Sequence, residues 1–131
     1  MDLQERIVDF IEGLELMLPV YNDNNSESDS LSLYSLPSGG VIQEYMDGTQ
    51  DKKFPFEIQL KVKQKDRGKG LTALTKISAE LERITSLDSH DDSFEFNKIE
   101  INNENYLSEI DEKYIYFRFT FSAYVTVRKG E

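Results

Sequence analysis

The most regular pattern in the sequence is the alternation of apolar and other side chains over residues 113–128. The apolar positions of this segment are Ile115, Phe117, Phe119, Phe121, Ala123, Val125 and Val127. Successive side chains of a β-strand point to opposite faces of a sheet, so a period of two predicts one long strand with an apolar face. The other face carries Tyr, Arg, Thr and Ser, which favours a central strand covered in part on both sides. The chain is therefore expected to fold around a β-sheet.

Two amphipathic helices are predicted, over residues 2–17 and 69–85. In the first, apolar side chains recur at helical spacing with acidic residues between them, and Pro19 closes the segment. The second is long enough to cover one face of the sheet. Its apolar positions are Leu71, Leu74, Ile77, Leu81 and Ile84.

Three strands are expected between the helices. Residues 31–36 and 41–46 flank the turn Pro37–Gly40, which predicts a hairpin. A second turn signal, Asp47–Gly48, leads into a cleaner strand over residues 54–63, whose even-numbered side chains are apolar and whose odd-numbered ones are mostly polar. Antiparallel pairing of the three strands in sequence order is the simplest arrangement.

A further strand is expected over residues 94–101. Its apolar side chains change from even to odd positions, which predicts a bulge near Asn97–Lys98. The predicted order is α-β-β-β-α-β-β, an α+β fold with a mostly antiparallel sheet of about five strands and two helices. A length of 131 residues fits one domain, residues 1–131. Within it, the polar and acidic segment 22–30 is expected to be a mobile loop.

Charge is distributed unevenly along the chain. It has 15 Lys and Arg against 25 Asp and Glu, a net charge of -10. Residues 1–51 hold eleven acidic residues and one base, Arg6, whereas residues 52–131 are balanced. A sequence-wide basic surface for binding phosphates is absent, so this layout favours a self-complementary or head-to-tail protein partner over free nucleic acid.

One group of basic residues alternates along the chain. If the strand that contains residues 54–63 continues, these side chains project from one face as a basic stripe. They are Lys61, Lys63, Lys65, Arg67 and Lys69. Two interpretations remain open: a solvated strand face, or a ridge that faces the acidic half of a neighbouring subunit.

The sequence gives little support to an enzyme. It has no Cys, no Ser-His-Asp arrangement and no nucleophile elbow, so no catalytic residue and no cofactor is predicted. The turn that holds Asp88, His90, Asp91 and Asp92 offers metal ligands, but a contiguous cluster lacks a distant ligand, and an exposed acidic turn is the simpler interpretation. No apolar run approaches the roughly 20 residues that span a bilayer, so a membrane is not expected and the cytosol is the default location.

Three segments carry a resemblance to a known family. They are Leu33–Gly40 (LYSLPSGG), Glu44–Thr49 (EYMDGT) and Phe54–Lys61 (FPFEIQLK), followed by the helix with Leu74, Ile77 and Leu81. This pattern resembles the minor capsid or tail-completion proteins of long-tailed phages (siphoviruses) and prophages of Gram-positive bacteria, which are related to the tail terminator proteins. The resemblance covers most of the chain and is most specific over residues 31–62.

The resemblance implies a tail-terminator-like fold and a structural role without catalytic residues, metal or cofactor. Such a protein forms a ring, usually a homohexamer, that caps the tail tube, ends its polymerisation and helps to join tail and head. The implied partners are further copies of the chain, the major tail tube protein and the head–neck connector protein, with DNA only passing through the lumen. The implied location is the tail–head junction of the virion, after synthesis in the cytoplasm of the bacterial host.

Candidate residues for the interface with a neighbouring subunit or the tube come from the basic stripe, the tyrosines and the acidic loop. They are Lys61, Lys63, Lys65, Arg67, Tyr45, Tyr114, Tyr116, Asp23, Glu27 and Asp29. One alternative role is that of a head-completion or connector ring protein. A second alternative is a small metal-binding module or hydrolase that uses the acidic turn around His90.

Overall fold

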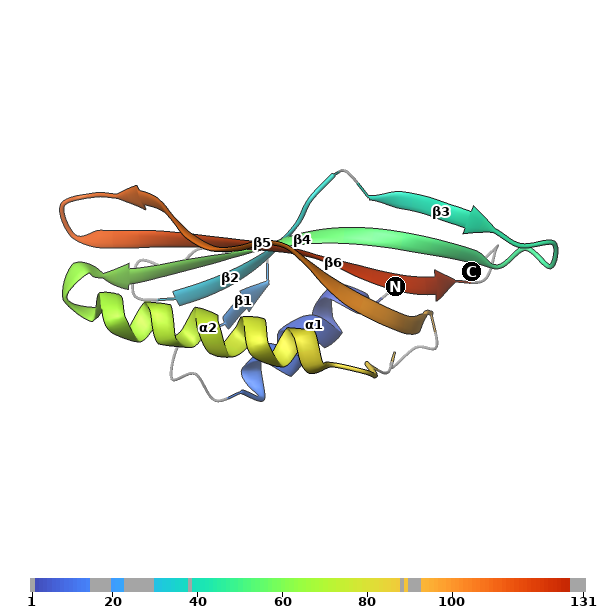
Figure 1. Ribbon diagram of the computed structural model, residues 1–131, viewed down its shortest axis with the longest axis horizontal. Helices are drawn as coiled ribbons and strands as arrows, with labels where there is room; N and C mark the ends of the chain where they lie inside the picture. The colour runs from blue at the N-terminus through green and yellow to red at the C-terminus, as the bar shows by residue number, and fades with distance from the viewer. Residues whose placement is uncertain are drawn as a thin grey trace.

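The computed structural model describes residues 2–14, 20–22, 30–37, 39–87, 89 and 93–127. In this part of the chain two helices lie on one side of a long, twisted, six-stranded sheet (Figure 1). The elements in chain order are α1 (Leu3–Glu12), β1 (Val20–Asn22), β2 (Ser30–Ser35), β3 (Gly40–Glu44), β4 (Gln50–Lys63), the short 3-10 helix η1 (Gln64–Asp66), α2 (Arg67–Arg83), β5 (Glu95–Ile110) and β6 (Tyr114–Val127).

The α+β class, the two helices and the mostly antiparallel sheet are confirmed. Strand β1 is an addition to the predicted order, and it pairs with β2 in parallel. Two residues of the segment predicted to be a mobile loop belong to strands: Asn22 ends β1, and the buried Ser30 begins β2. Residues 23–29 of that segment lie outside the described residues. The predicted helix over residues 2–17 ends as an α-helix at Glu12.

Strand β6 is central, as its two-sided pattern predicts. The strand order is β1-β2-β4-β6-β5, with β3 also paired to β4. Strands β4 and β6 pair without interruption from Gln50 opposite Val127 to Lys63 opposite Tyr114. The bulge expected near Asn97–Lys98 is confirmed, because the register of β5 against β6 shifts between Phe96 and Lys98.

The predicted hairpin of residues 31–36 with 41–46 is wrong. Strands β2 and β3 both pair with β4, one after the other along the same edge. Leu36 N–H donates to the carbonyl of Pro55 at 3.0 Å. In an antiparallel pair the N–H and C=O of one residue point to the same neighbouring strand, so the N–H of residue 55 would be expected to donate back to Leu36. Pro55 has no N–H to donate there, so the edge is interrupted where β2 ends and before β3 begins. The Pro37–Gly40 segment therefore continues along β4 instead of reversing the chain.

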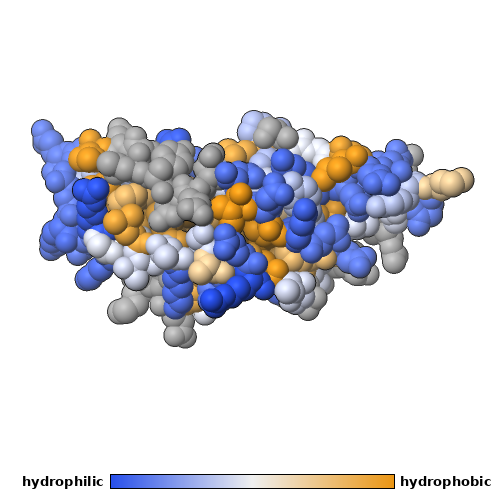
Figure 2. Space-filling view, in the orientation of Figure 1, coloured by the Kyte–Doolittle hydropathy of each residue, from blue (hydrophilic) through white to orange (hydrophobic). Residues whose placement is uncertain are grey.

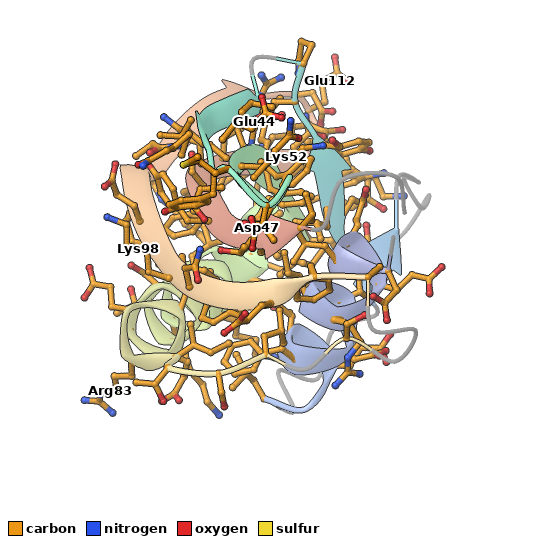
Figure 3. All side chains as sticks on the ribbon, turned by 90° about the vertical axis from the view of Figure 1, so that its right-hand side faces the viewer. Glu44, Asp47, Lys52, Arg83, Lys98 and Glu112 are labelled. Atoms are coloured by element: carbon orange, nitrogen blue, oxygen red, sulfur yellow. The ribbon has the colours of Figure 1, made fainter. Side chains whose placement is uncertain are left out.

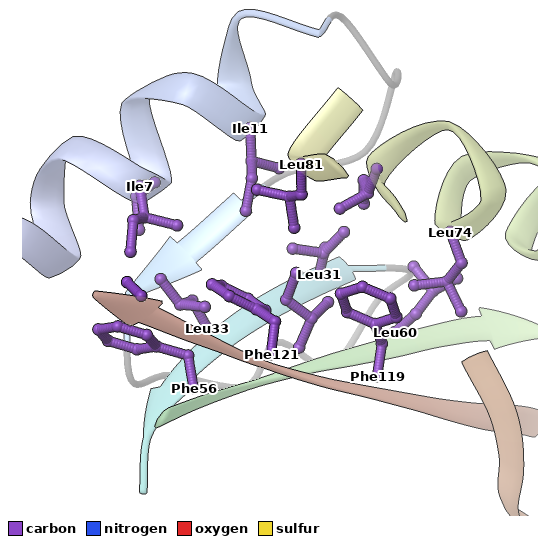
Figure 4. Packing of buried hydrophobic residues seen from close by; sticks show 14 of the residues in the cluster. Ile7, Ile11, Leu31, Leu33, Phe56, Leu60, Leu74, Leu81, Phe119 and Phe121 are labelled. Atoms are coloured by element: carbon purple, nitrogen blue, oxygen red, sulfur yellow. The ribbon is translucent and has the colours of Figure 1, made fainter. Parts of the chain in front are cut away.

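The core lies between the sheet and the two helices (Figure 4). Phe119 and Phe121 of β6 are fully buried beneath Ile7 and Ile11 of α1 and beneath the apolar side of α2. The ring of Phe56 stacks on that of Phe121, with 5.6 Å between the centroids. The even-numbered apolar side chains of residues 56–62 are buried as predicted. Burial of this continuous apolar face supplies the main driving force for the fold.

Polar contacts tie the helices to the rest of the chain. Asp2, at the start of α1, accepts hydrogen bonds from Ser89 Oγ at 2.6 Å and Ser93 Oγ at 3.2 Å, although it is almost fully buried. Lys76 Nζ on α2 donates to the carbonyl of Leu14 at 2.9 Å. The two helices are thus fixed relative to each other and to the segment that enters β5.

Candidate subunit interface

The sheet extends past the helices at one end, where the β3–β4 hairpin projects (Figure 1). This end, called the hairpin end below, consists of residues 40–53. Strand β4 runs from here to η1 at the other end of the molecule over 14 residues. At about 3.3 Å per residue, that strand separates the two ends by roughly 45 Å.

The turn of the hairpin end is built from its local sequence. Gly48 has a φ of 90°, a conformation that side chains with a Cβ rarely adopt. Asp47 Oδ1 accepts from the backbone N–H of Thr49 at 3.0 Å and from its hydroxyl at 2.7 Å. Tyr45 N–H donates to the carbonyl of Thr49 at 2.8 Å. The Asp-Gly-Thr sequence therefore holds the tip in one conformation.

A second group of hydrogen bonds secures the tip to the central strand. Tyr45 Oη and Thr126 Oγ1 donate to the two carboxylate oxygens of Asp51, each at 2.6 Å. The hydrogen bond from Thr126, followed by that from Tyr45, lowers the pKa of Asp51 below its ordinary value. The same bond to Asp51 raises the pKa of the Tyr45 hydroxyl. These residues, with Met46, Asp47 and Thr49, line a shallow open depression.

The hairpin end displays apolar side chains that have no core to enter. Every residue of β3 is exposed. Val41 and Ile42 are each more than half exposed, Tyr45 is 43% exposed and Met46 is fully exposed. Figure 2 shows hydrophobic atoms at this end among hydrophilic ones. Several exposed apolar side chains on one projecting hairpin indicate a surface that another molecule covers.

The opposite end, called the basic end below, consists of residues 61–71 and the β5–β6 turn at residues 110–113. Gln64 N–H donates to the carbonyl of Lys113 at 3.2 Å, which joins η1 to that turn. Asp111 Oδ1 accepts from the N–H groups of Tyr114 at 2.6 Å and Lys113 at 2.8 Å. Those two bonds, the Tyr114 bond first, lower the pKa of Asp111. Lys65, Arg67 and Lys69 are exposed here, and so are Leu71 and Ile110.

The basic stripe is not the straight row that continuation of the strand would give. Strand β4 ends at Lys63, so only Lys61 and Lys63 belong to it, while Lys65 lies in η1 and Arg67 begins α2. The chain turns here because η1 closes onto the β5–β6 turn. The basic side chains therefore extend around a corner of the molecule, from the sheet face to the start of α2.

Aromatic residues do accompany this stripe, but they come from the neighbouring strand. Lys61 Nζ lies 4.3 Å from the ring centroid of Tyr114, and Lys113 Nζ lies 5.4 Å from it. Lys98 and Lys53 approach the ring of Tyr124 in the same way, at 4.8 and 5.9 Å. The Tyr114 ring is buried and that of Tyr124 is half-buried. Cation–π contacts contribute about 0.5–1 kcal/mol at exposed sites and about 2 kcal/mol where the ring is desolvated, and these contacts hold the lysines against the sheet.

The structure brings most of the candidate residues to one end. Lys61, Lys63, Lys65, Arg67, Tyr114 and Tyr116 gather at the basic end, and Tyr116 Oη donates to Asp111 at 3.1 Å. Tyr45 lies instead at the hairpin end, and Asp23, Glu27 and Asp29 fall outside the described residues. The sequence analysis missed Val41, Ile42 and Met46. The signal that could have identified them is the adjacent apolar pair Val41–Ile42, which does not fit a strand with one buried face.

A metal site is not visible in the part of the chain that the structure describes, where no three His, Cys, Asp or Glu side chains converge. Asp88, His90, Asp91 and Asp92, the turn considered for a metal or hydrolase, lie outside that part. Neither described helix is long and apolar enough to cross a membrane.

The chain was compared with protein-family models and with curated proteins. No family model matches it, and no curated protein matches it either. The functional conclusion therefore rests on the fold, on the two ends of the sheet and on the sequence segments that form them.

Proposed function

We propose that this protein is a structural assembly protein of long-tailed phages or prophages, of the tail terminator type. Its subunits form a ring, with a hexamer as the expected size, that caps the tail tube and ends its polymerisation. The ring also presents a surface to the head–neck connector protein. In this role the protein acts in the virion, DNA only passes through the lumen, and no catalysis or cofactor is required.

The observation that carries the proposal is the presence of two unlike ends on one sheet. The hairpin end exposes apolar side chains, and the basic end exposes Lys65, Arg67 and Lys69. The two ends lie at opposite ends of β4, which is paired along its whole length to the central strand. Subunits that join unlike surfaces form a ring whenever the rotation between neighbours closes. A sheet with this layout suits a ring subunit.

The segments that carry the family resemblance support the same proposal. Leu33–Gly40 runs from β2 to the start of β3, Glu44–Thr49 forms the hairpin turn, and Phe54–Lys61 lies in β4. The resemblance thus falls on the neighbouring strands β2, β3 and β4 and on the projecting hairpin. Tyr45 and Met46 of the second segment are exposed, whereas the even-numbered apolar side chains of the third segment from Phe56 to Leu60 are buried in the core.

The proposal is tested on the full chain by sedimentation and electron microscopy, alone and with the major tail tube protein of the same phage. Closed rings are expected, together with tubes that are capped and shortened when the protein is present during polymerisation. A monomer that leaves tube length unchanged would overturn the proposal. Rings that bind the connector protein but not the tube would identify the head-completion role instead.

Charge reversal examines the basic end directly. Lys63→Glu combined with Lys65→Glu should weaken ring formation, because repulsion across a charged interface opposes association. The matched control is Arg83→Glu, since Arg83 lies at the last turn of α2 and its ion pair with Glu80 at 3.7 Å is exposed. Unchanged assembly of the Lys63 and Lys65 variant would favour the solvated-face interpretation of these residues.

A further inference from the structure

The hairpin tip has the features of an anchor that enters a partner surface. Four of the six residues from 41 to 46 have exposed apolar or aromatic side chains: Val41 and Ile42 in β3, and Tyr45 and Met46 in the turn. The turn is held by the Asp47 hydrogen bonds and by the Tyr45–Asp51–Thr126 contacts. A tip that is already ordered loses little conformational entropy on binding, so its apolar area can contribute to affinity. Apolar anchors at the centre of an interface supply most of its binding energy.

The charges around the tip indicate which surface it fits. The hairpin carries the acidic residues Glu44, Asp47 and Asp51, and two basic residues, Lys52 and Lys53, lie opposite Val41 and Gly40 on β4. Figure 3 shows Glu44, Asp47 and Lys52 at this end of the molecule. The complementary surface on this chain is the basic end, where residues 61–71 and 110–113 together hold six basic residues and three acidic ones, Asp66, Asp111 and Glu112. That end also offers exposed apolar side chains, Leu71 on α2 and Ile110 beside the β5–β6 turn.

The geometry points to a second copy of this chain as the partner: the hairpin tip of one subunit docks on the basic end of the next, between η1, the first turn of α2 and the β5–β6 turn. This inference rests on the proposed ring and specifies its contact. The two surfaces lie at opposite ends of β4, so the tip of a subunit cannot contact the basic end of the same subunit. Each contact leaves one tip and one basic end open, and the series ends only when a ring closes.

Cross-linking tests the contact directly, because the chain has no Cys of its own. A Met46→Cys protein is mixed with a Lys69→Cys protein and treated with a short bis-maleimide reagent. The control mixture replaces the second protein with Glu82→Cys, whose site is exposed and lies about 20 Å further along α2. A mixed dimer at least about tenfold above the control is expected. Equal yields in the two mixtures, or cross-linking of Met46→Cys only with itself, would overturn the contact.

A second measurement removes the anchor without touching the core. The double variant Ile42→Asp, Met46→Asp should weaken self-association at least about tenfold, while its unfolding midpoint stays that of the wild type, because both side chains are exposed. Met46→Leu is the matched control and should assemble normally. Rings formed by the double variant at wild-type concentration would overturn the inference and leave the proposed function standing. A wild-type chain that remains monomeric would overturn both.

Discussion

Pro55, which has no backbone N–H, and Gly39, which has no Cβ, determine how β2 and β3 pair along one side of β4. Pro55 removes one N–H from β4, and the edge changes there from β2 to β3. Gly39 passes so close to β4 that an added Cβ would lie 2.5 Å from the carbonyl oxygen of Lys53 and 2.8 Å from Cδ of Pro55. The chain can follow β4 past the proline only because residue 39 has no side chain.

Gly39→Ala is therefore expected to destabilise the protein by about 1–3 kcal/mol, since the backbone must move to relieve the overlap. Urea unfolding followed by circular dichroism measures the change. Gly40→Ala is the control: a Cβ at that position meets no atom within 4 Å, so its effect should stay within about 0.5 kcal/mol. Equal effects of the two substitutions would show that the close approach at Gly39 is absent.

Asp51 makes the stability of the hairpin end dependent on pH. Its folded-state pKa is lowered by the hydrogen bonds from Thr126 and Tyr45, so the folded protein favours the ionised carboxylate. This contribution is complete above the unfolded pKa, about 3.9, and is lost as the pH falls through the lower folded value. Asp51→Asn should therefore reduce the loss of stability below about pH 4, measured by thermal unfolding at several pH values. The control is Glu12→Gln on α1. If the two variants lose the same stability below about pH 4, the hydrogen bonds to Asp51 do not contribute to stability in solution.

Among the elements, α2 packs closely on β4 at its first turns. Gly70 is buried against β4, and an added Cβ would lie 3.0 Å from Cγ2 of Val62 and 3.1 Å from Cδ2 of Leu60. Gly68, two residues earlier, has open space around it. In the structure, Gly70 serves the packing of a helix on a strand.

The two glycines of α2 give a paired prediction. Gly68→Ala should stabilise the protein by up to about 1 kcal/mol, because Ala favours the helical backbone. Gly70→Ala gains the same propensity but crowds Leu60 and Val62, so it should be about 1–2 kcal/mol less stable than Gly68→Ala. Chemical unfolding of both variants measures the difference. Equal stabilities would mean that α2 can shift away from β4 without cost.

In the whole molecule, the acidic and basic residues that are separated along the chain are also separated in space. Helix α1 belongs to the acidic residues 1–51, has three exposed acidic residues and packs beneath the middle of the sheet. The basic residues of 61–69 lie instead at one end of the molecule. Apolar side chains are exposed at both ends of β4, with the basic excess at only one of them. Contact between unlike ends of neighbouring subunits would bring opposite charges together and exclude water from the apolar side chains.

Self-association through such a contact should weaken as salt increases. Raising the ionic strength from about 0.05 to about 0.5 M shortens the screening length to less than half. The attraction between the charged residues of the two ends then contributes less to association, whereas the contact of the apolar side chains is kept. Sedimentation velocity should show a several-fold weaker association at high salt, without complete dissociation. Association that strengthens steadily with salt would indicate a contact made by apolar groups alone.

Long, regular patterns in the sequence predicted the elements well. The alternation over residues 113–128 identified the central strand, and the apolar positions Leu74, Ile77 and Leu81 identified the helix that covers it. The parity change beside Asn97 correctly placed the bulge. These signals are reliable because burial of one face of a strand or helix imposes its period directly on the sequence. Of the candidate interface, the basic residues were found in this way, whereas the exposed apolar tip was not.

Local periodicity in the sequence predicts most of the side chains that enter the core and the positions of α2, β4 and β6, because burial of one face imposes its period on the residues. Leu71, an apolar position of the predicted helix, is nevertheless exposed, and the strand expected over residues 94–101 continues to Ile110. Long-range contacts alone determine that β2 and β3 share one side of β4, that the basic residues turn a corner at Lys63, and that Val41, Ile42 and Met46 remain uncovered. These features depend on which distant backbone groups are available for pairing. A single missing N–H at Pro55 changes the partners of two strands, and a turn signal such as Pro37–Gly40 carries no information about the strand that lies beside it.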